Sequence, residues 1–469
     1  MDTDFLDWMD RQQGRQYDLH ARHVNPVFVK MLRTIGFDKA YVRGEGSYLY
    51  DEDGNRYLDF LTGWGVFALG RNHPKVKSIL EQVLSREMPN LVRMECSLMA
   101  GLVAEKLTSH TACGTGAGLS RVFFTNSGTE SVEAAIKFAR CATGKQRIVY
   151  CDQAFHGLTV GSLSLNGAGF FRERFGELMP GTEETPFNDL AALERALFRK
   201  DVAAFVVEPV QGKSCRVVAD GYLADAQRLC RKAGALLVVD EVQSGLGRTG
   251  KWFAYQHWPE VEPDIVCAAK ALSGGYVPVG AVITTPRIMD TVFDSMERCV
   301  VHSNTFGQND LAMAAALATL RVMEEDRLVE NAAALGQYAI ESLAEVGRSC
   351  PFVDEIRGKG LMFGIDFRRP KHSLKLKAAW DTLHKLNFGV FSQMITVPLL
   401  QEHRILTQVA GYHTEVIKFL PPLNVTKSDI DWFLTAMGKV LEDIQQVPGA
   451  AWNTMAAMAK GVVRAQISA

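Results

Sequence analysis

The sequence has no run of about 18 consecutive apolar residues, so it contains no segment typical of a transmembrane helix. Residues 1–18 are acidic and polar, without the basic start and apolar core of a secretory signal. The nine cysteines are scattered and form no C-x-x-C pair, a pattern typical of reduced thiols in a long chain. We therefore expect a cytoplasmic protein.

Neither sign of charge dominates the chain, in which 51 Lys and Arg face 53 Asp and Glu for a net charge of −2. Nothing in this balance attracts nucleic acid or an anionic membrane, so we expect neither as a partner. His20 and His23 lie close together, but no Glu or Cys completes a zinc pattern, and we expect no metal site. With 47% hydrophobic residues among 469, the chain can bury a sizeable core.

The middle of the chain alternates short apolar runs with longer helical patterns. The runs are rich in β-branched residues and show little polar alternation, as in strands covered on both faces. They occupy residues 121–125, 147–151, 203–207, 235–239 and 264–268, with helical stretches at 129–143 and 222–234 among them. This order predicts an α/β fold with a doubly wound, mostly parallel sheet.

The two ends of the chain follow a different pattern. Residues 48–60 predict a hairpin with an Asp-Gly turn at 53–54. Long helices are expected at 327–348, 373–387 and 428–444, strands within 356–367, and a helical tail at 450–466. We expect both ends to form a smaller α+β domain (1–70 with 326–469) beside a large domain (71–325).

Polar residues follow each predicted strand of the large domain. In an open parallel sheet, ligands bind at the carboxyl ends of the strands, so these side chains are expected to converge on one edge. They are, in chain order, Ser127, Gly128 and Thr129, then Phe155 and His156, then Glu208, then Asp240 and Gln243, and finally Lys270.

Each of these features has an ordinary structural interpretation as well as a functional one. The segment 126–129 is either a simple helix cap or a phosphate site at a helix N-terminus. Asp240 either forms a structural ion pair or bonds a protonated ring nitrogen. Lys270 either extends to solvent or is a desolvated nucleophile towards a carbonyl. Pyridoxal phosphate needs a lysine, an acid and a phosphate cradle together, and an aromatic ring such as Phe155 suits its face.

Two glycine-rich segments give weaker evidence for a ligand site. Residues 245–250 match G-x-G-x-x-G after a predicted strand, but the aromatic-rich segment 251–258 is a poor helix opening. Residues 114–118 precede a strand and predict a loop. We expect no dinucleotide site.

Several long motifs, in one order, resemble the class III (ω-amino-acid type) aminotransferases, pyridoxal-phosphate enzymes of fold type I. The resemblance spans about residues 40–440. The motifs are GEGSYLYDEDGNRYLDF, LGRNHP, TNSGTESVEAAIKFAR, FHG, VVEPVQG, VVDEVQSGLGRTG, the segment around Lys270, HSNTFGQN and LPPLNVT.

The resemblance implies a role for each matching residue. Lys270 is expected to be the Schiff-base lysine and general acid/base, and Asp240 the acid at the ring nitrogen of pyridoxal 5′-phosphate. Ser127, Gly128 and Thr129 would hold the phosphate, Phe155 would stack on the ring with His156 beside it, and Gln243 would reach the phenolic oxygen. Glu208 would lie near the substrate entrance, and Trp64 and Phe67 would line the pocket. Thr305 would contact the phosphate of the neighbouring subunit in a homodimer with shared active sites.

One position departs from the family pattern. Lys418 stands where many amino-acid-specific members carry an arginine that binds the substrate carboxylate, and lysine cannot make the same bidentate contact. Arg404 could compensate, or the substrate could be a diamine, another ω-amine or an aldehyde. We expect ping-pong transfer of an ω-amino group from a diamino acid or diamine to a keto acid or aldehyde. A same-fold aminomutase, racemase, decarboxylase or amine-phospholyase and a non-catalytic α/β binding protein remain alternatives.

Overall fold

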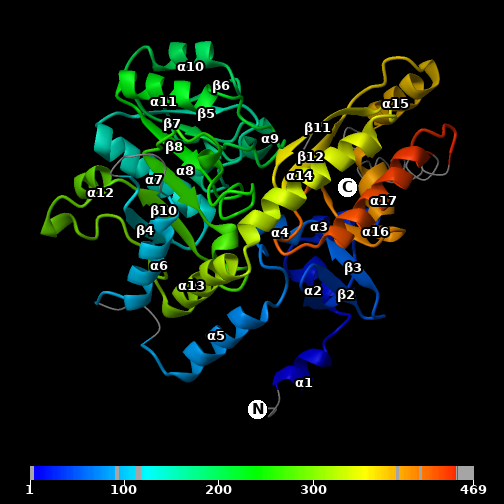
Figure 1. Ribbon diagram of the computed structural model, residues 1–469, viewed down its shortest axis with the longest axis horizontal. Coiled ribbons are helices and arrows are strands. Elements are labelled where there is room, and N and C mark those ends of the chain that lie inside the picture. The colour runs from blue at the N-terminus through cyan, green and yellow to red at the C-terminus, as the bar shows by residue number, and fades with distance from the viewer. Residues whose placement is uncertain are drawn as a thin grey trace.

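The computed structural model describes residues 5–89, 95–111, 118–386, 390–410, 415–449 and Trp452. Its main feature is a seven-stranded sheet in the order β4-β10-β9-β8-β7-β5-β6, on the left in Figure 1. The five predicted strands are confirmed as β4 (Arg121–Thr125), β5 (Arg147–Cys151), β7 (Val202–Val207), β8 (Leu236–Asp240) and β9 (Ile265–Ala268). Parallel pairing joins β6, β5, β7, β8 and β9, so the prediction of a mostly parallel sheet is confirmed.

Two strands of this sheet have no counterpart in the sequence prediction. β10 (Gly280–Thr284) lies between β4 and β9 and is antiparallel to both. β6 (Thr182–Thr185) is a short polar strand at the edge beside β5. A four-residue polar edge strand carries neither an apolar run nor a clear alternation, so its sequence gives little signal.

Both faces of the large sheet are covered, which explains the continuous apolar runs. Alternate residues such as Val206 and Val238 face α7 (Gly128–Thr143), whose Val132 and Phe138 belong to the same cluster. The intervening residues, Val239 among them, belong to the other core cluster, with α11 (Tyr222–Ala233) and α13 (Asp310–Glu325). The period of two along each strand therefore divides the core between the two helical layers.

The predicted hairpin at 48–60 is confirmed as β2 (Tyr48–Asp51) and β3 (Arg56–Asp59), with Gly54 at φ +78° in the turn. β1 (Tyr41–Glu45) extends it, and β13 (Ile405–Leu406) pairs with β3 in parallel. The two ends of the chain thus share one sheet, as Figure 1 shows on its right-hand side. The boundaries near residues 70 and 325 stay a prediction.

A third sheet has the order β11-β12-β15-β14. Its strands are β11 (Val353–Lys359), β12 (Met362–Phe367), β15 (Val416–Phe419) and β14 (Gln408–Val409), and they confirm the strands expected within 356–367. The three predicted carboxy-terminal helices are α14 (Leu328–Gly347), α15 (Leu374–Leu386) and α17 (Lys427–Asp443), joined by α16 (Val390–Gln401). Apart from Trp452, the tail expected to be helical lies outside the described residues.

The remaining helices surround these sheets. They are α1 (Phe5–Asp10), α2 (Gln16–His23), α3 (Pro26–Ile35), α4 (Thr62–Gly65), α5 (Pro74–Ser85), α6 (Leu98–Ser109), α8 (Val160–Leu163), α9 (Gly169–Arg172), α10 (Leu190–Leu197) and α12 (Pro286–Val292), with 3₁₀ turns η1 (Ala254–His257), η2 (Lys270–Ser273) and η3 (Met296–Arg298). Within the described ranges, no helix combines the length and apolar character needed to cross a bilayer.

Candidate active site

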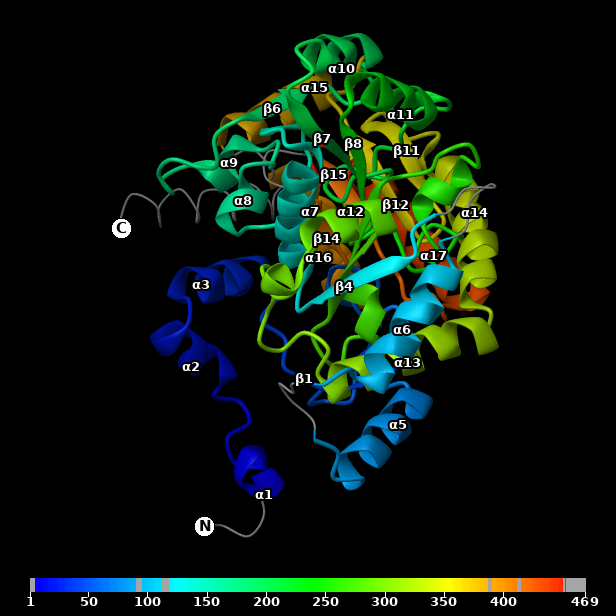
Figure 2. The same ribbon diagram turned by 90° about the vertical axis from the view of Figure 1, so that its left-hand side faces the viewer.

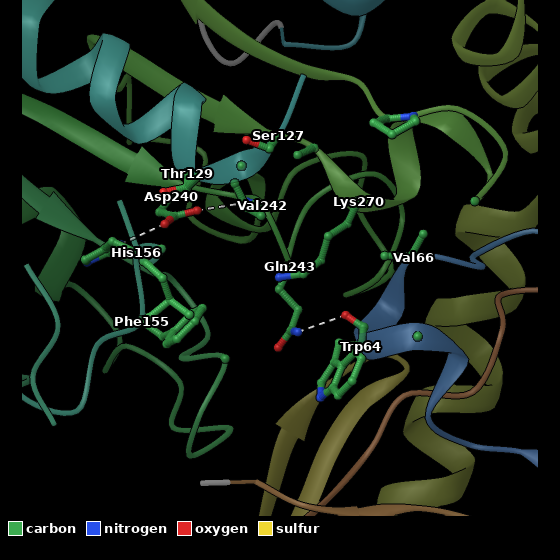
Figure 3. A pocket seen from close by; sticks show the side chains of 18 of the residues that line it. Trp64, Val66, Ser127, Thr129, Phe155, His156, Asp240, Val242, Gln243 and Lys270 are labelled. Carbon is green, nitrogen blue, oxygen red and sulfur yellow. Dashed lines mark hydrogen bonds and ion pairs between the residues drawn. The ribbon is translucent and has the colours of Figure 1, made fainter. Parts of the chain in front are cut away.

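A cavity of about 790 Å³ lies at the carboxyl ends of β5, β7, β8 and β9. Its volume is in the range of small-molecule sites. Its wall contains eleven of the residues expected at the site: Trp64, Ser127, Gly128, Thr129, Phe155, His156, Glu208, Asp240, Gln243, Lys270 and Lys418 (most are seen in Figure 3). The convergence expected from the strand ends is therefore confirmed.

Three expected site residues lie elsewhere. Phe67 lines a neighbouring hollow, where its ring lies 3.6 Å from the guanidinium carbon of Arg71. Arg404 is exposed, precedes β13 at φ +56° and lies outside the wall, so its compensation for Lys418 stays a prediction. Thr305 is exposed and also lies outside the wall of its own chain's cavity. The positions of these three residues along the chain did not indicate that they lie outside the cavity wall.

Lys270 begins η2 immediately after β9, with a backbone φ of +42° that is costly for a residue with a side chain. Ala269, Ala271 and Ser273 around it are buried and small. Burial lowers the pKa of the Lys270 ammonium below its ordinary value, although Asp240 and Glu208 oppose the shift. Among the described residues, no hydrogen-bond partner engages its Nζ atom. The side chain points into the cavity (Figure 3) and is available to a ligand.

Asp240 ends β8 and makes two short contacts. Its Oδ2 atom lies 2.7 Å from Nδ1 of His156, and its Oδ1 atom accepts the Val242 amide at 3.0 Å (Figure 3). Burial opposes protonation of His156, but the hydrogen bond to Asp240 and the negative charges of Asp240 and Glu208 together outweigh burial and raise the pKa of this imidazole. The structural ion pair considered for Asp240 is thus present, and the same carboxylate still faces the cavity.

Glu208 follows β7 and is buried. One carboxylate oxygen accepts the Phe155 amide at 3.1 Å and the other accepts the Gly212 amide at 2.8 Å. Burial raises the pKa of Glu208, while the positive charge of His156 lowers it and Asp240 raises it further. Glu208 thereby fixes two loops of the cavity wall through their backbones.

The first turn of α7 forms another part of the wall. Ser127 caps the helix, since its hydroxyl accepts the Glu130 amide at 3.3 Å, so the capping interpretation holds as well. Gly128 lies so close to Val242 that an added Cβ would stand 2.6 Å from its Cγ1 atom. The Thr129 hydroxyl bonds Thr159 at 2.7 Å and Ser162 at 2.6 Å. A glycine that brings the backbone of a helix N-terminus to the cavity suits an anion such as phosphate.

A chain of hydrogen bonds crosses the cavity wall between the two ends of the sequence. Lys418, on β15, donates to the Gly212 carbonyl at 2.5 Å and to Oε1 of Gln243 at 3.0 Å. Gln243 in turn donates to the Trp64 carbonyl at 3.0 Å (Figure 3). Trp64 is 56% exposed and adopts φ +61°, directly after Gly63 at +59°. The expected roles of Gln243 and Trp64 stay predictions, but both residues are in place.

Sequence reasoning missed several residues of the wall, among them Val242 and Lys213. Val242, between Asp240 and Gln243, packs against Gly128, and its apolar side chain lines the cavity together with Phe155. Lys213 lines the cavity with Nζ lying 4.5 Å from the ring centre of Phe155. The V-D-E-V-Q motif could have indicated Val242. This residue lies two positions after Asp240, and alternate residues of an extended segment point to the same side. No sequence signal indicated Lys213.

One of the two glycine-rich segments is described by the structure. Residues 245–250 form turns and lead to the short η1, so no long helix opens at this glycine motif. Most of the other glycine segment, residues 114–117, lies outside the described residues. Over those described, no group of three or more His, Cys, Asp or Glu side chains is placed to hold a metal ion.

Comparison with known proteins agrees with the geometry. The model of the family "Aminotransferase class-III" matches residues 35–441. The chain is 36% identical over 458 residues to "Aminotransferase PigE" of Serratia sp., covering 91% of this chain and 53% of that protein. The chain therefore spans about half the length of this curated relative.

Two solved structures illustrate the similarity of the fold. The ornithine aminotransferase from Toxoplasma gondii, described with partial occupancy of PLP at its active site, superposes with a TM-score of 0.77 and 28% identity. The match covers 95% of this chain and 100% of the other. An amine transaminase from an uncultivated Pseudomonas species, in a PLP-bound form, gives 0.75 and 27% over 86% and 94% of the two chains.

Proposed function

Because the chain belongs to the class III aminotransferase family, we propose that it transfers an amino group from a donor amine to a carbonyl acceptor with ping-pong kinetics. Its cofactor is pyridoxal 5′-phosphate, as in the related structures. The observation that carries the proposal is the meeting of Lys270, Asp240 and the N-terminus of α7 around one cavity.

The residues present fit this cofactor. Gly128 and Thr129 would hold the phosphate, because the start of α7 comes close to the cavity and a side chain at Gly128 would collide with Val242. Phe155 and Val242 offer an aromatic and an apolar surface for a flat ring. Asp240, oriented by its contact with His156, would bond a protonated ring nitrogen. Gln243 would offer its amide to the phenolic oxygen.

When bound, the cofactor supplies an aldehyde that takes up the amino group and a ring that accepts electrons from the reacting carbon. Lys270 would bind the aldehyde and, once released by the donor amine, would carry a proton on Nζ between carbon atoms. Its lowered pKa suits that task, because a general base works best when a sizeable fraction is neutral. Glu208 holds the Phe155 and Gly212 amides, and thereby the shape of the pocket.

We propose an ω-amine of a diamino acid or a diamine as donor, and a keto acid or aldehyde as acceptor. Two features support this choice: the similarity to ornithine and amine transaminases, and the lysine at position 418 in place of an arginine. PigE is named an aminotransferase, but this chain covers only 53% of its length. The aminotransferase activity of this chain is therefore a proposal.

The test is a titration of the purified protein, loaded with pyridoxal phosphate, against ornithine, 2,4-diaminobutyrate, putrescine, alanine and glutamate. The visible absorption band of the bound cofactor should bleach with one class of donor and return when 2-oxoglutarate or pyruvate is added. Turnover of a single substrate without an acceptor would indicate an aminomutase, racemase, decarboxylase or lyase instead. Failure to bind pyridoxal phosphate would contradict the catalytic proposal and favour a binding protein.

We further propose that the protein is a cytoplasmic homodimer whose subunits complete each other's sites. Helices α1–α3, in blue at the lower left of Figure 2, expose apolar side chains such as Phe5, Val24 and Val27. Thr305 and Phe306 are also exposed, outside their own chain's cavity wall. Light scattering coupled to gel filtration should give a mass of two chains, and a monomer that binds cofactor normally would contradict this proposal.

A further inference from the structure

The cavity contains two lysines besides Lys270, and they differ in what surrounds their ammonium groups. Lys418 is buried and donates hydrogen bonds to two protein acceptors, the Gly212 carbonyl and the Gln243 amide oxygen. Lys213 is only partly buried and, among the described residues, has no hydrogen-bond acceptor within reach of Nζ. Lys418, where the family resemblance would place a substrate arginine, is therefore already engaged, whereas the ammonium of Lys213 is available.

The ammonium of Lys213 lies against two aromatic rings. Its Nζ atom is 4.5 Å from the ring centre of Phe155 and 4.3 Å from that of Phe171, and these two rings meet edge to face at 5.6 Å. An ammonium on aromatic faces is held in position by their quadrupoles and keeps its N–H groups for another acceptor. The rings thus fix the direction of the side chain without using its hydrogen bonds.

The backbone that carries Lys213 is fixed from both sides. The Gly212 amide donates to Glu208 at 2.8 Å, and the Gly212 carbonyl accepts from Lys418 at 2.5 Å. A bridge between Val210 and Val217 closes the loop at its base. Lys418 therefore acts on the neighbouring peptide, and it keeps Lys213 at the cavity wall.

The charge of the wall also favours an anion beside Lys213. Lys213, Lys270, Lys418 and the imidazole of His156 are the basic groups, while Glu208 and Asp240 are the acidic ones. Both acids are engaged, Glu208 by two backbone amides and Asp240 by His156. Neither acid is left to pair with Lys213, so its ammonium attracts an anion that enters the cavity.

We propose that Lys213 binds the carboxylate of an acidic substrate of this pocket, the 2-oxo acid acceptor foremost. The inference rests on the proposed aminotransferase function and names the residue that recognises its acidic substrate. Lys418 is in this view a positioning residue, which holds Gly212 and Gln243 and does not itself anchor the carboxylate. Burial lowers the pKa of Lys213 to about 8, and a carboxylate that pairs with the ammonium opposes this shift.

The test compares Lys213→Met, which keeps length and apolar contact, with Lys213→Arg, which keeps the charge. The matched control is Lys439→Met, since Lys439 is exposed on α17. Two acceptors are used with the same donor, 2-oxoglutarate and the uncharged aldehyde butanal. Lys213→Met should raise KM for 2-oxoglutarate by about 10- to 100-fold, as expected for one lost charge-assisted hydrogen bond, and leave KM for butanal within about twofold. Lys213→Arg should restore most of the loss.

A second measurement needs no turnover. Glutarate carries the carboxylates of 2-oxoglutarate without the reactive carbonyl, and calorimetric titration of the cofactor-loaded protein should show weaker glutarate binding in Lys213→Met by the same factor. Equal glutarate affinity in Lys213→Met and wild type, or equal effects on the acidic and neutral acceptors, would overturn the assignment and leave the aminotransferase proposal intact. A wild type that binds cofactor and glutarate but transfers no amine would instead contradict the proposed function.

Discussion

The Oδ2 atom of Asp240 lies 2.7 Å from Nδ1 of His156, and both side chains are buried at the end of β8. The pair joins a strand end to the loop after β5, over 84 residues of sequence. It also fixes the orientation of a carboxylate at the cavity wall, where Oδ1 of Asp240 accepts the Val242 amide. Replacement of either partner therefore has consequences for the ionisation of the other.

Asp240→Asn removes the charge that supports the imidazolium of His156. We expect the pKa of His156 to fall, because burial then acts without its opposing partner. We also expect a loss of about 1.5–3 kcal/mol in the free energy of unfolding of the cofactor-free protein, the value of one hydrogen bond to a charged group. Histidine titration by NMR and urea unfolding measure the two effects. Asp225→Asn, in an exposed pair with Arg228, should cost less than about 1 kcal/mol. An unchanged pKa of His156 would contradict the coupling.

Lys270→Ala should abolish covalent attachment of the cofactor. Borohydride reduction of the loaded wild type, followed by peptide mass spectrometry, should place the label on Lys270, and the variant should carry none. We expect kcat to fall by at least about 10²- to 10⁴-fold, since the variant also lacks the general acid/base. Lys439→Ala on exposed α17 is the control and should label at Lys270 as the wild type does. A label on another lysine of the wild type would show that the assignment of Lys270 is wrong.

Gly128→Ala should weaken cofactor binding through a collision and not through backbone strain. The added Cβ would lie 2.6 Å from Cγ1 of Val242, so the start of α7 must move away from the cavity wall. Overpacking of this kind costs about 1–3 kcal/mol, and we expect the dissociation constant of pyridoxal phosphate to rise at least about tenfold. Fluorescence titration of the cofactor-free protein measures it.

Two further variants separate the collision from a general effect on helices. Gly128→Ala combined with Val242→Ala should regain part of the lost affinity, because the smaller side chain leaves room for the new methyl group. Gly101→Ala in α6, where an added Cβ meets no atom within 4 Å, should bind cofactor normally and gain up to about 1 kcal/mol of stability. A double variant as weak as Gly128→Ala alone would exclude Val242 as the cause.

Lys418 gives the stability a dependence on pH. Burial lowers the pKa of Lys418 to about 7, with Lys270 and Lys213 adding to the shift and Cys215 and Glu208 opposing it, while an unfolded lysine titrates near 10.5. Between about pH 7 and 10.5 the unfolded chain binds more protons than the folded chain. The free energy of unfolding therefore increases as the pH is raised through this range.

Lys418→Met removes this contribution. Unfolding of the cofactor-free wild type and variant in urea at pH 7.5 and 9.5 should show that the wild type gains on the order of 1–2 kcal/mol relative to the variant over that interval. Lys439→Met serves as the control and should follow the wild type. If the free energy of unfolding changed equally with pH in the wild type and in Lys418→Met, the pKa of Lys418 would be the same in the folded and unfolded states, which contradicts the prediction.

Much of the large domain could be predicted because its strands are buried on both faces. β4 and β5 have the predicted bounds, β7 and β9 differ by one residue at their first end, and β8 is shifted by one residue. A strand in that environment must be apolar at every position, which makes it visible in the sequence, and the polar residue that ends it then marks the ligand edge. Asp240, Glu208 and Lys270 were found in this way.

The residues outside the cavity wall and those missed lie where packing between distant segments decides. Phe67, Arg404 and Thr305 lie outside the cavity wall of their own chain, and their expected roles stay predictions. Sequence also gave no reason to separate Lys213 from Lys418. Their difference arises because β15 brings Lys418 against the loop 210–217, more than 200 residues earlier, and the Gly212 carbonyl occupies its ammonium.

The sequence by itself determined five apolar strands in their order along the chain, the residues at the end of each strand and the cofactor that these residues suit. Burial on two faces and helix capping are local requirements, and they are therefore visible in the sequence. The tertiary structure decided which cation of the cavity is available to a ligand and which glycine admits no side chain. Those outcomes depend on contacts between residues that are distant in the sequence. Packing sets the distances between their atoms, and the spacing of residues along the chain does not predict them.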